Sequence, residues 1–257
     1  MTDAEPSTRP RLTFFFPAYN EEENIARTVE LAHSQIGPLV SSIEVLAIDD
    51  GSTDRTPQLA DELAAADPRV RVHHQPNRGY GGAIKAGFAE ARGELICFSD
   101  GDLQFDLREM SRLLDRFADT SKPVDAVIGY RIKRRDPFQR IFIAKTYNAI
   151  VSVAFGLRVR DIDCAMKLFR REVFDGLRLD AEGPFLSAEL LIKLRARGVR
   201  MAQVGVNHFP RAAGTNTGAS LGKILRTFRD LAKLRWDLWT RRDEVLGHGV
   251  APVKPPR

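Results

Sequence analysis

Short apolar runs alternate with amphipathic segments between residues 12 and 105. A compact apolar run is typical of a buried strand, whereas apolar residues spaced three and four apart predict a helix. Here the order strand–helix occurs three times and is followed by a further strand. This order predicts an α/β fold with a mostly parallel, doubly wound sheet and helices on both faces. The predicted strands are Leu12–Phe16, Ile43–Ile48, Val70–His74 and Glu94–Phe98.

Polar and conformationally restricted residues predict where these elements end. Pro17 is expected to end the first strand, because proline lacks the N–H group that a strand ladder uses. Asn20 is expected to cap the next helix through its side-chain oxygen. Thr53 or Asp54 is expected to do the same for a helix that runs through Ala66.

The second half of the chain carries longer helical patterns. Two stretches, Asp161–Arg171 and Phe185–Arg197, are together interpreted as loop, short strand and helix. Further strands are predicted at Val124–Ile128 and Val199–Val206, and helices at Leu107–Phe117, Gln139–Phe155 and Leu221–Trp239. We therefore divide the chain into a disordered N-terminus (1–10), an α/β domain (11–219), a C-terminal amphipathic helix (220–242) and a disordered tail (243–257).

Positive charge is concentrated in two stretches. The chain has a net charge of +5, and residues 221–257 carry nine Lys or Arg against four Asp or Glu. Residues 131–145 carry six basic residues and one acidic residue. Such patches suit phosphates, anionic lipids or nucleic acid. Because the basic residues lack interleaved aromatic residues and a recognisable reading module, we expect no nucleic-acid partner.

Cysteine usage and hydropathy predict the compartment. Only two cysteines are present, and Cys97 lies in an apolar strand, so we do not expect a disulfide. We therefore expect the protein to lie in the reducing cytoplasm. The polar stretch Met1–Arg11 does not have the pattern of a signal peptide. No run of 18 apolar residues occurs, so we expect no membrane span.

The stretch Ser99–Asp106, hereafter the acidic turn, carries the clearest chemistry. It follows the predicted strand Glu94–Phe98, and ligands bind at the carboxyl ends of strands in open α/β sheets. Asp100 and Asp102 stand one residue apart and can share a hard cation such as Mg²⁺ or Mn²⁺. The plain alternative is an ordinary acidic turn, because Asp and Gly are common turn residues.

Five motifs occur in order along the chain: Pro17-Ala-Tyr-Asn-Glu-Glu, Asp49-Asp-Gly-Ser-Thr-Asp, Asn77-Arg-Gly-Tyr-Gly-Gly-Ala, Asp100-Gly-Asp-Leu-Gln and Gly129-Tyr-Arg. Together they resemble the motifs of family 2 glycosyltransferases with the GT-A fold, a Rossmann-like sheet. The closer resemblance is to dolichol- and polyprenol-phosphate sugar synthases, and it covers about residues 12 to 233.

The resemblance implies roles for individual residues. A divalent cation, Mg²⁺ or Mn²⁺, would be held by Asp100, Asp102 and Gln104. The phosphate of the acceptor would be held by Arg140 and by Lys167, which stands where the family has Arg. The nucleotide-sugar would be bound by Pro17, Tyr19, Glu21, Ile48, Asp50, Asp100, Gly101, Asp102, Gln104, Arg131 and Arg211.

The nature of the acceptor decides which catalytic groups are needed. A lipid phosphate is already anionic and can attack the sugar C1 directly, so a cation at Asp102 together with Arg131 would suffice. A single displacement of this kind inverts C1. A hydroxyl acceptor would require a base, for which Asp163 and Glu189 are candidates. The plain reading of each is a surface carboxylate or a helix salt bridge.

We therefore expect an inverting, metal-dependent glycosyltransferase that moves a sugar from a GDP- or UDP-sugar to a dolichyl- or undecaprenyl-type phosphate. We expect it to be cytoplasmic and peripheral at the membrane surface, and a separate integral-membrane protein is a candidate partner. One alternative is a family 2 transferase that acts on a hydroxyl of a saccharide, lipid or small molecule. A distant alternative is a basic nucleic-acid-binding protein without enzymatic activity.

Overall fold

The computed structural model describes residues 9–101, 103–132, 138–183, 185–209 and 221–247, with residues 138–142 and 221–225 as backbone only. The strands are β1 (Arg11–Ala18), β2 (Ser42–Asp49), β3 (Val70–His74), β4 (Leu95–Phe98), β5 (Ala126–Arg131), β6 (Lys167–Arg170) and β7 (Met201–Val206). The α-helices are α1 (Ile25–Leu31), α2 (Thr56–Ala66), α3 (Gly79–Glu90), α4 (Met110–Ala118), α5 (Phe138–Phe155), α6 (Leu186–Ala196), α7 (Leu221–Thr240) and α8 (Arg242–Leu246). Shorter helical turns are η1 (Ala32–Ile36), η2 (Gly37–Leu39), η3 (Leu107–Glu109) and η4 (Arg171–Phe174).

The strands form one mostly parallel sheet, which confirms the predicted fold class. Their order is β3-β2-β1-β4-β6-β5-β7, and β6 alone among the described strands runs antiparallel to both of its neighbours. Strand β1 lies between β2 and β4 and pairs in parallel with both, so the carboxyl ends of all three strands lie at one edge of the sheet. The turns that carry the predicted ligand-binding motifs therefore converge on that edge.

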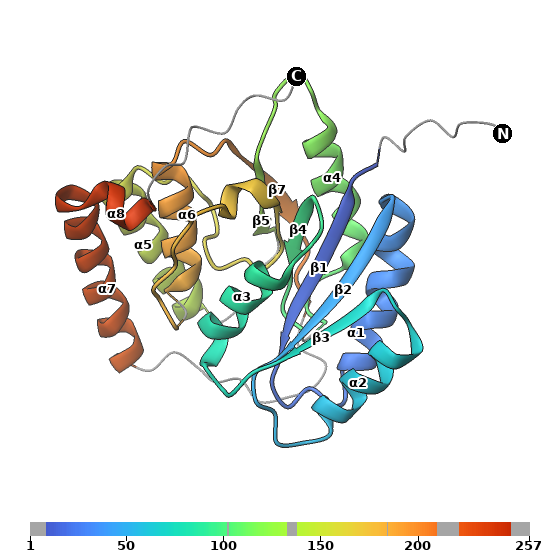
Figure 1. Cartoon of the computed structure of the whole chain (residues 1–257). Helices are drawn as coiled ribbons and strands as arrows, with labels where there is room; N and C mark the ends of the chain where they lie inside the picture. The colour runs from blue at the N-terminus through green and yellow to red at the C-terminus, as the bar shows by residue number, and fades with distance from the viewer. Residues whose placement is uncertain (1–8, 102, 133–137, 184, 210–220, 248–257) are drawn as a thin grey trace.

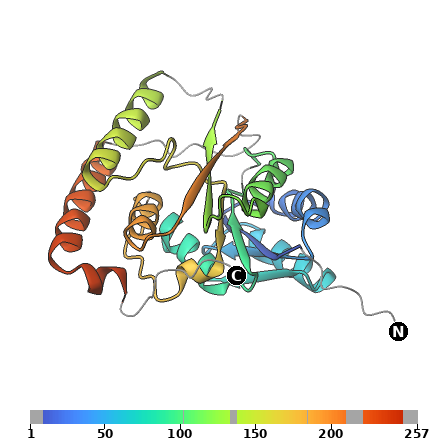
Figure 2. The same ribbon diagram turned by 90° about the horizontal axis from the view of Figure 1, so that it is seen from above.

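Helices cover both faces of the sheet (Figure 1). Viewed from above, α1 and α4 lie on one side, whereas α3 and α6 lie on the other (Figure 2). Helices α5 and α7 lie beside each other, outside α6. The amphipathic helix predicted at the C-terminal end is thus one half of an outer helix pair.

Aromatic side chains fill the core between the sheet and α3. Phe15 of β1 stacks on Phe98 of β4 with ring centroids 5.5 Å apart, and Phe88 of α3 packs edge-on against Phe15 at 5.1 Å. Gly87 permits this approach, because a Cβ atom there would lie 2.2 Å from the Phe15 ring. Full burial of each such side chain stabilises the fold by about 1.5–3 kcal/mol.

Several predicted boundaries differ from the observed ones. Strand β1 continues through Pro17 to Ala18. Strand β4 pairs with β1 only as far as Phe15, so the chain past that point has a ladder partner on one side alone, where proline is tolerated. Strand β5 extends to Arg131, because it pairs with β7 along its whole length. The tail predicted to be disordered from residue 243 instead begins with α8.

The predicted cap at Asn20 is wrong. Helix α1 begins after Asn24, whose side chain makes no capping hydrogen bond. Asn20 adopts a left-handed backbone conformation with φ of 55°, and its Oδ1 accepts a hydrogen bond from the backbone N–H of Thr53 at 2.8 Å. The predicted cap of α2 at Thr53 or Asp54 is wrong as well, because the N-cap residue is Arg55, which makes no side-chain capping hydrogen bond. Asp54, one residue earlier, accepts from the backbone N–H of Thr56 at 2.9 Å. Asn20 thus links two loops at the sheet edge.

Candidate active site

The acidic turn lies directly against the end of β1. A Cβ atom on Gly101 would come within 3.0 Å of the Pro17 carbonyl oxygen, so the turn needs glycine at this close approach. The carbonyl oxygen of Gly101 accepts a hydrogen bond from the Thr28 hydroxyl of α1 at 3.4 Å. Leu103 adopts a φ of 58°, a conformation that a residue with a side chain keeps only where its surroundings hold it. Asp100 is therefore presented on a tightly constrained turn.

The donor set of this turn fits a hard divalent cation. Asp100 supplies carboxylate oxygens at the carboxyl end of β4, and Mg²⁺ or Mn²⁺ is commonly held by one or two carboxylates plus substrate phosphates. In the described ranges, no three His, Cys, Asp or Glu side chains gather in a metal-binding cluster. The Asp100 carboxylate thus fits a cation to which a bound diphosphate adds further oxygen ligands.

Asp50 forms the opposite wall of the edge, after β2. Its backbone N–H donates to the Ala18 carbonyl oxygen at 2.9 Å. Its Oδ1 accepts from Gln75 Nε2 at 2.6 Å and from the backbone N–H of Arg78 at 2.8 Å. These bonds fix a carboxylate that is only 4% exposed beside Tyr19, whose ring is half exposed. A carboxylate and an exposed ring at one edge can receive the base or ribose of a nucleotide.

Glu21 and Ile48, which are also predicted to bind the nucleotide-sugar, make contacts that stabilise the loop after β1 and the core of the sheet. Glu21 donates its backbone N–H to the Thr56 hydroxyl at 2.8 Å, and its Oε2 accepts from Asn24 Nδ2 at 2.7 Å. Ile48 pairs with Pro17 in the β1–β2 register. The side chain of Ile48 is fully buried, so it shapes the edge from within the core.

Arg131, the last residue of β5, is held by a carboxylate that sequence reasoning missed. Its Nε and Nη2 donate to Oδ2 and Oδ1 of Asp161 at 2.7 and 2.8 Å, a two-pronged ion pair. Burial acts to lower the pKa of Arg131, but the hydrogen bonds and charge of Asp161 outweigh burial and raise it. The guanidinium is therefore a fixed positive charge.

A group of charges surrounds this pair. Asp163 is exposed, and its charge acts on Arg131, on Tyr147 and on Lys167. Burial, followed by the charge of Asp163, raises the pKa of Tyr147. Burial lowers the pKa of Lys167, while Cys164 and nearby carboxylates, including that of Asp100, oppose this effect. The buried Lys167 thus connects the acidic turn electrostatically with the Arg131 side of the edge.

Lys167 is predicted to hold an acceptor phosphate, but its side chain faces inward. It is fully buried, donates to the carbonyl oxygen of Cys164, and lies 5.1 Å from the centroid of the Phe98 ring. In this structure its ammonium group is a counter-charge inside the site rather than a surface ligand.

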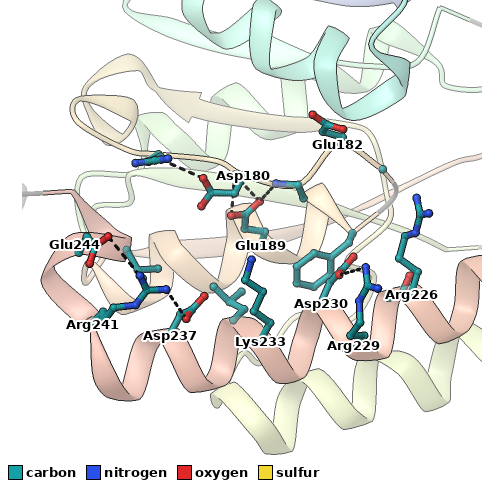
Figure 3. A pocket seen from close by; sticks show the side chains of 17 residues that line it. Asp180, Glu182, Glu189, Arg226, Arg229, Asp230, Lys233, Asp237, Arg241 and Glu244 are labelled. Carbon is teal, nitrogen blue, oxygen red and sulfur yellow. Dashed lines mark hydrogen bonds and ion pairs between the residues drawn. The ribbon is translucent and has the colours of Figure 1, made fainter.

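Glu189 occupies a different place. It is 2% exposed, and it accepts hydrogen bonds from the backbone N–H groups of Asp180 and Ala181 at distances from 2.8 to 3.1 Å. Lys193 Nζ lies 2.6 Å from its Oε1. Glu189, Asp180 and Ala181 line a cavity of about 620 Å³ that α7 borders on the other side (Figure 3). In the described part of the chain, Glu189 thus joins its own helix to Asp180 and Ala181.

Gln104 joins the acidic turn to the chain after β7. Its backbone carbonyl accepts from the N–H of Phe209 at 2.8 Å, and its Nε2 donates to the Phe209 carbonyl oxygen at 3.1 Å. The predictions for Asp102, for Arg211 and for the side chain of Arg140 lie outside the described residues. The contact of Asp161 with Arg131 and those of Gln104 with Phe209 join residues far apart in sequence, so sequence patterns did not predict these contacts.

An open, mostly parallel sheet with an acidic turn after its fourth strand defines a GT-A type of fold. The family model described as Glycosyl transferase family 2 matches residues 13–178, more than half of the 257 residues. The chain belongs to this family, which confirms the resemblance seen in its motifs.

Two curated relatives are similar over most of the chain. Glycosyltransferase AglD of Haloferax volcanii is 35% identical over 235 residues, which cover 88% of this chain and 37% of AglD. The chain therefore spans little more than a third of AglD. Polyprenol monophosphomannose synthase of Mycolicibacterium smegmatis is 32% identical over 228 residues, which cover 82% of this chain and 83% of that protein.

Solved structures agree on the fold. Glucosyl-3-phosphoglycerate synthase from Mycobacterium tuberculosis, in complex with phosphoglyceric acid, matches with a TM-score of 0.63 and 21% identity, covering 90% of this chain and 80% of that one. The same enzyme in complex with Mn²⁺, UDP and glucosyl-3-phosphoglycerate matches with a TM-score of 0.60. At this identity the likeness concerns the fold alone.

Proposed function

We propose that the protein transfers a sugar from a nucleotide-sugar to a polyprenyl phosphate, with inversion at C1 and with Mg²⁺ or Mn²⁺. The observation that carries this proposal is that Asp50, Asp100 and Arg131 stand at the carboxyl ends of β2, β4 and β5, three strands that run in the same direction in one sheet. The names of the relatives support the acceptor class, since they include a polyprenol monophosphomannose synthase and an undecaprenyl-phosphate 4-deoxy-4-formamido-L-arabinose transferase.

On the donor side, Tyr19 and Asp50 receive the base and ribose, and Pro17, Glu21 and Ile48 shape that wall. Asp100 holds the cation, with Asp102 and Gln104 as further ligands. A divalent cation held by these residues would supply positive charge for the departing nucleoside diphosphate. Arg211 adds positive charge at the diphosphate.

On the acceptor side, an anionic phosphate oxygen attacks C1 while the bond to the nucleoside diphosphate breaks. No strong base is needed, because this oxygen carries no proton at neutral pH. The main task is to bring two anions together, and Arg131 supplies fixed positive charge for that purpose. Arg140 completes the acceptor-phosphate contacts, and the buried Lys167 supports them only as a counter-charge inside the site.

A second candidate function is transfer to a hydroxyl group, and one observation keeps it in view. Asp163 is an exposed carboxylate whose charge acts on Arg131. If the acceptor were a hydroxyl, Asp163 would be placed to take its proton, whereas Glu189 is engaged by backbone N–H groups and Lys193.

The outer helix pair supports work at a membrane surface. Trp236 and Trp239 of α7 are 61% and 72% exposed, and Val153 of α5 is exposed as well. Arg235, next to Trp236 in the sequence, is exposed too, and basic residues beside tryptophans are typical of interfacial helices on anionic lipid. None of the described helices has both the length and the apolarity needed to cross a bilayer. We place the protein on the cytoplasmic face, where an integral-membrane partner could recruit it.

The test incubates the full chain with radiolabelled GDP- and UDP-sugars, polyprenyl phosphate and Mg²⁺ or Mn²⁺. Label that passes into the organic extract, and that is lost in the Asp100→Asn variant, supports the proposal. Label that enters only water-soluble glycosides would contradict it and favour a hydroxyl acceptor.

A further inference from the structure

The chain after β7 folds back onto the acidic turn. Phe209 and Gln104 exchange two hydrogen bonds, one through the Phe209 N–H and one through the Gln104 side-chain amide. Phe105 and His208 form an isolated antiparallel bridge, and their rings lie 5.1 Å apart, centroid to centroid. This three-residue segment, Asn207–Phe209, therefore acts as a short strand that pairs with the second half of the turn.

Glu109, at the end of the η3 turn that leads into α4, holds this segment from a second side. Its Oε2 accepts from the backbone N–H of Asn207 at 2.6 Å, and its Oε1 accepts from Asn207 Nδ2 at 2.9 Å. The carboxylate is mostly buried, with 11% of its side chain exposed, and its ion partner is Arg112 at 3.3 Å. Hydrogen bonds to a charged acceptor are stronger than neutral ones. Glu109 thus fastens the segment at a residue 98 positions away in sequence.

The acidic turn needs such support. Leu103 has a φ of 58°, a conformation that costs energy for any residue with a side chain. The first half of the turn is held by the contacts of Gly101 with Pro17 and Thr28. The second half is held by Asn207–Phe209. The backbone that presents Asp100 is therefore braced on both sides of Leu103.

We infer that Glu109 is a positioning residue for the nucleotide–cation site: by holding Asn207 it keeps the segment 207–209 paired with the acidic turn, and so keeps Asp100 and Gln104 in the geometry that receives the cation. This inference rests on the proposed function. Glu109 itself touches no substrate, because both of its oxygen atoms are engaged with Asn207.

Three variants separate positioning from simple stabilisation. Glu109→Ala removes both hydrogen bonds to Asn207. Glu109→Gln keeps an oxygen for the Asn207 N–H, and a flipped Asn207 amide can accept from the new amide, so it is the conservative rescue. Arg112→Ala is the matched control, since it removes the other partner of Glu109 and leaves Asn207 in place. Asn207→Ala is a milder variant should Glu109→Ala fail to fold.

The first measurement is calorimetric binding of UDP and of GDP to the full chain, with and without Mn²⁺. For Glu109→Ala we expect Mn²⁺-dependent binding to weaken at least about tenfold, and Mn²⁺-independent binding to change by less than about twofold. Glu109→Gln and Arg112→Ala should stay within about threefold of wild type. Unchanged Mn²⁺-dependent binding in folded Glu109→Ala, or an equal loss in Arg112→Ala, overturns the inference.

The second measurement is hydrogen exchange at the backbone amides of Asn207 and Phe209, without ligand. Exchange should become faster in Glu109→Ala and in Asn207→Ala but not in Arg112→Ala, and unchanged exchange overturns the inference. If wild type binds neither nucleotide with Mn²⁺, the proposed function fails, and with it the role of Glu109 at that site. Faster exchange in Glu109→Ala would then show that Glu109 holds the segment 207–209 in place, but not that it positions a nucleotide–cation site.

Discussion

Asp163 and Glu189 are the two carboxylates that the sequence offered as catalytic bases, and the structure treats them in opposite ways. Asp163 is exposed, and its charge acts on Arg131, Tyr147 and Lys167. Glu189 is 2% exposed and is enclosed by two backbone N–H groups and an ammonium group. Glu189, whose oxygen atoms are taken by local donors, holds the fold together, whereas Asp163 lies at the surface near the fixed cation Arg131.

The cations of the two regions differ in the same way. Arg131 is paired with Asp161 at the sheet edge, and 13% of its side chain stays exposed. Lys193 is fully buried and is shared by Glu189, by Asp180 at 3.0 Å and by the Arg178 carbonyl oxygen at 2.7 Å. An incoming phosphate can meet the first cation without breaking the fold, but it cannot meet the second.

The largest effect is expected at the acidic turn. Asp100→Asn removes negative charge from the cation site, so kcat for sugar transfer should fall about 10²–10³-fold. The measurement is steady-state transfer at saturating Mn²⁺, with the thermal unfolding midpoint as a control for folding. Retention of more than about a tenth of wild-type kcat would show that the cation is held elsewhere.

At Glu189, stability rather than catalysis should change. Glu189→Ala leaves Lys193 buried without its closest carboxylate, so the free energy of unfolding should fall by about 3–5 kcal/mol. Activity per folded molecule should stay within about twofold. The matched change Asp163→Asn should leave denaturant unfolding nearly unaltered. A Glu189 variant that folds normally but cannot transfer sugar would reverse the contrast between the two carboxylates.

Arg131→Lys sharpens the comparison between the cations. Lysine keeps the charge but loses the two parallel bonds to Asp161, so its position at the sheet edge is no longer fixed. We expect kcat/KM for the acceptor to fall about 10–100-fold, with a smaller change in nucleotide binding measured by calorimetry. Equal losses for donor and acceptor would place Arg131 on the diphosphate instead.

The smallest effect is expected in the pH dependence of stability, at the contact between His74 and Asp49. The hydrogen bond with Asp49 raises the pKa of His74 above 6.5, burial opposes this, and Asp61 adds to the rise. A raised pKa means that the stabilisation is complete below pH 6.5 and is lost as pH rises through the folded-state value. His74→Gln should therefore cost more stability at pH 6 than at pH 9, by less than about 1 kcal/mol because the ring is 42% exposed. Denaturant unfolding at both pH values checks this, and an equal cost would contradict it.

Local patterns predicted the elements that local physics determines. The apolar runs located β1 to β4, and helical spacing located α5 and α7. Contacts between distant residues could not be predicted in this way. Asp161 meets Arg131 across 30 residues and Glu109 meets Asn207 across 98, and no periodicity relates such positions. The antiparallel direction of β6 is of the same kind, because it depends on which strands it joins.

The expected cap at Asn20 failed for a related reason. An Asn side chain can cap a helix or join two loops, and only its partner in the folded chain decides between these roles. Here that partner is the N–H of Thr53, from a loop 33 residues later.

The most direct test of the central claim is the position of Mn²⁺ in crystals of the full chain grown with UDP or GDP, located by its anomalous scattering. The account predicts one peak in contact with the Asp100 carboxylate and with the diphosphate, on the side of the edge that faces Arg131. A peak in the cavity beside Glu189 and α7, or a diphosphate bound with no metal at Asp100, would contradict it.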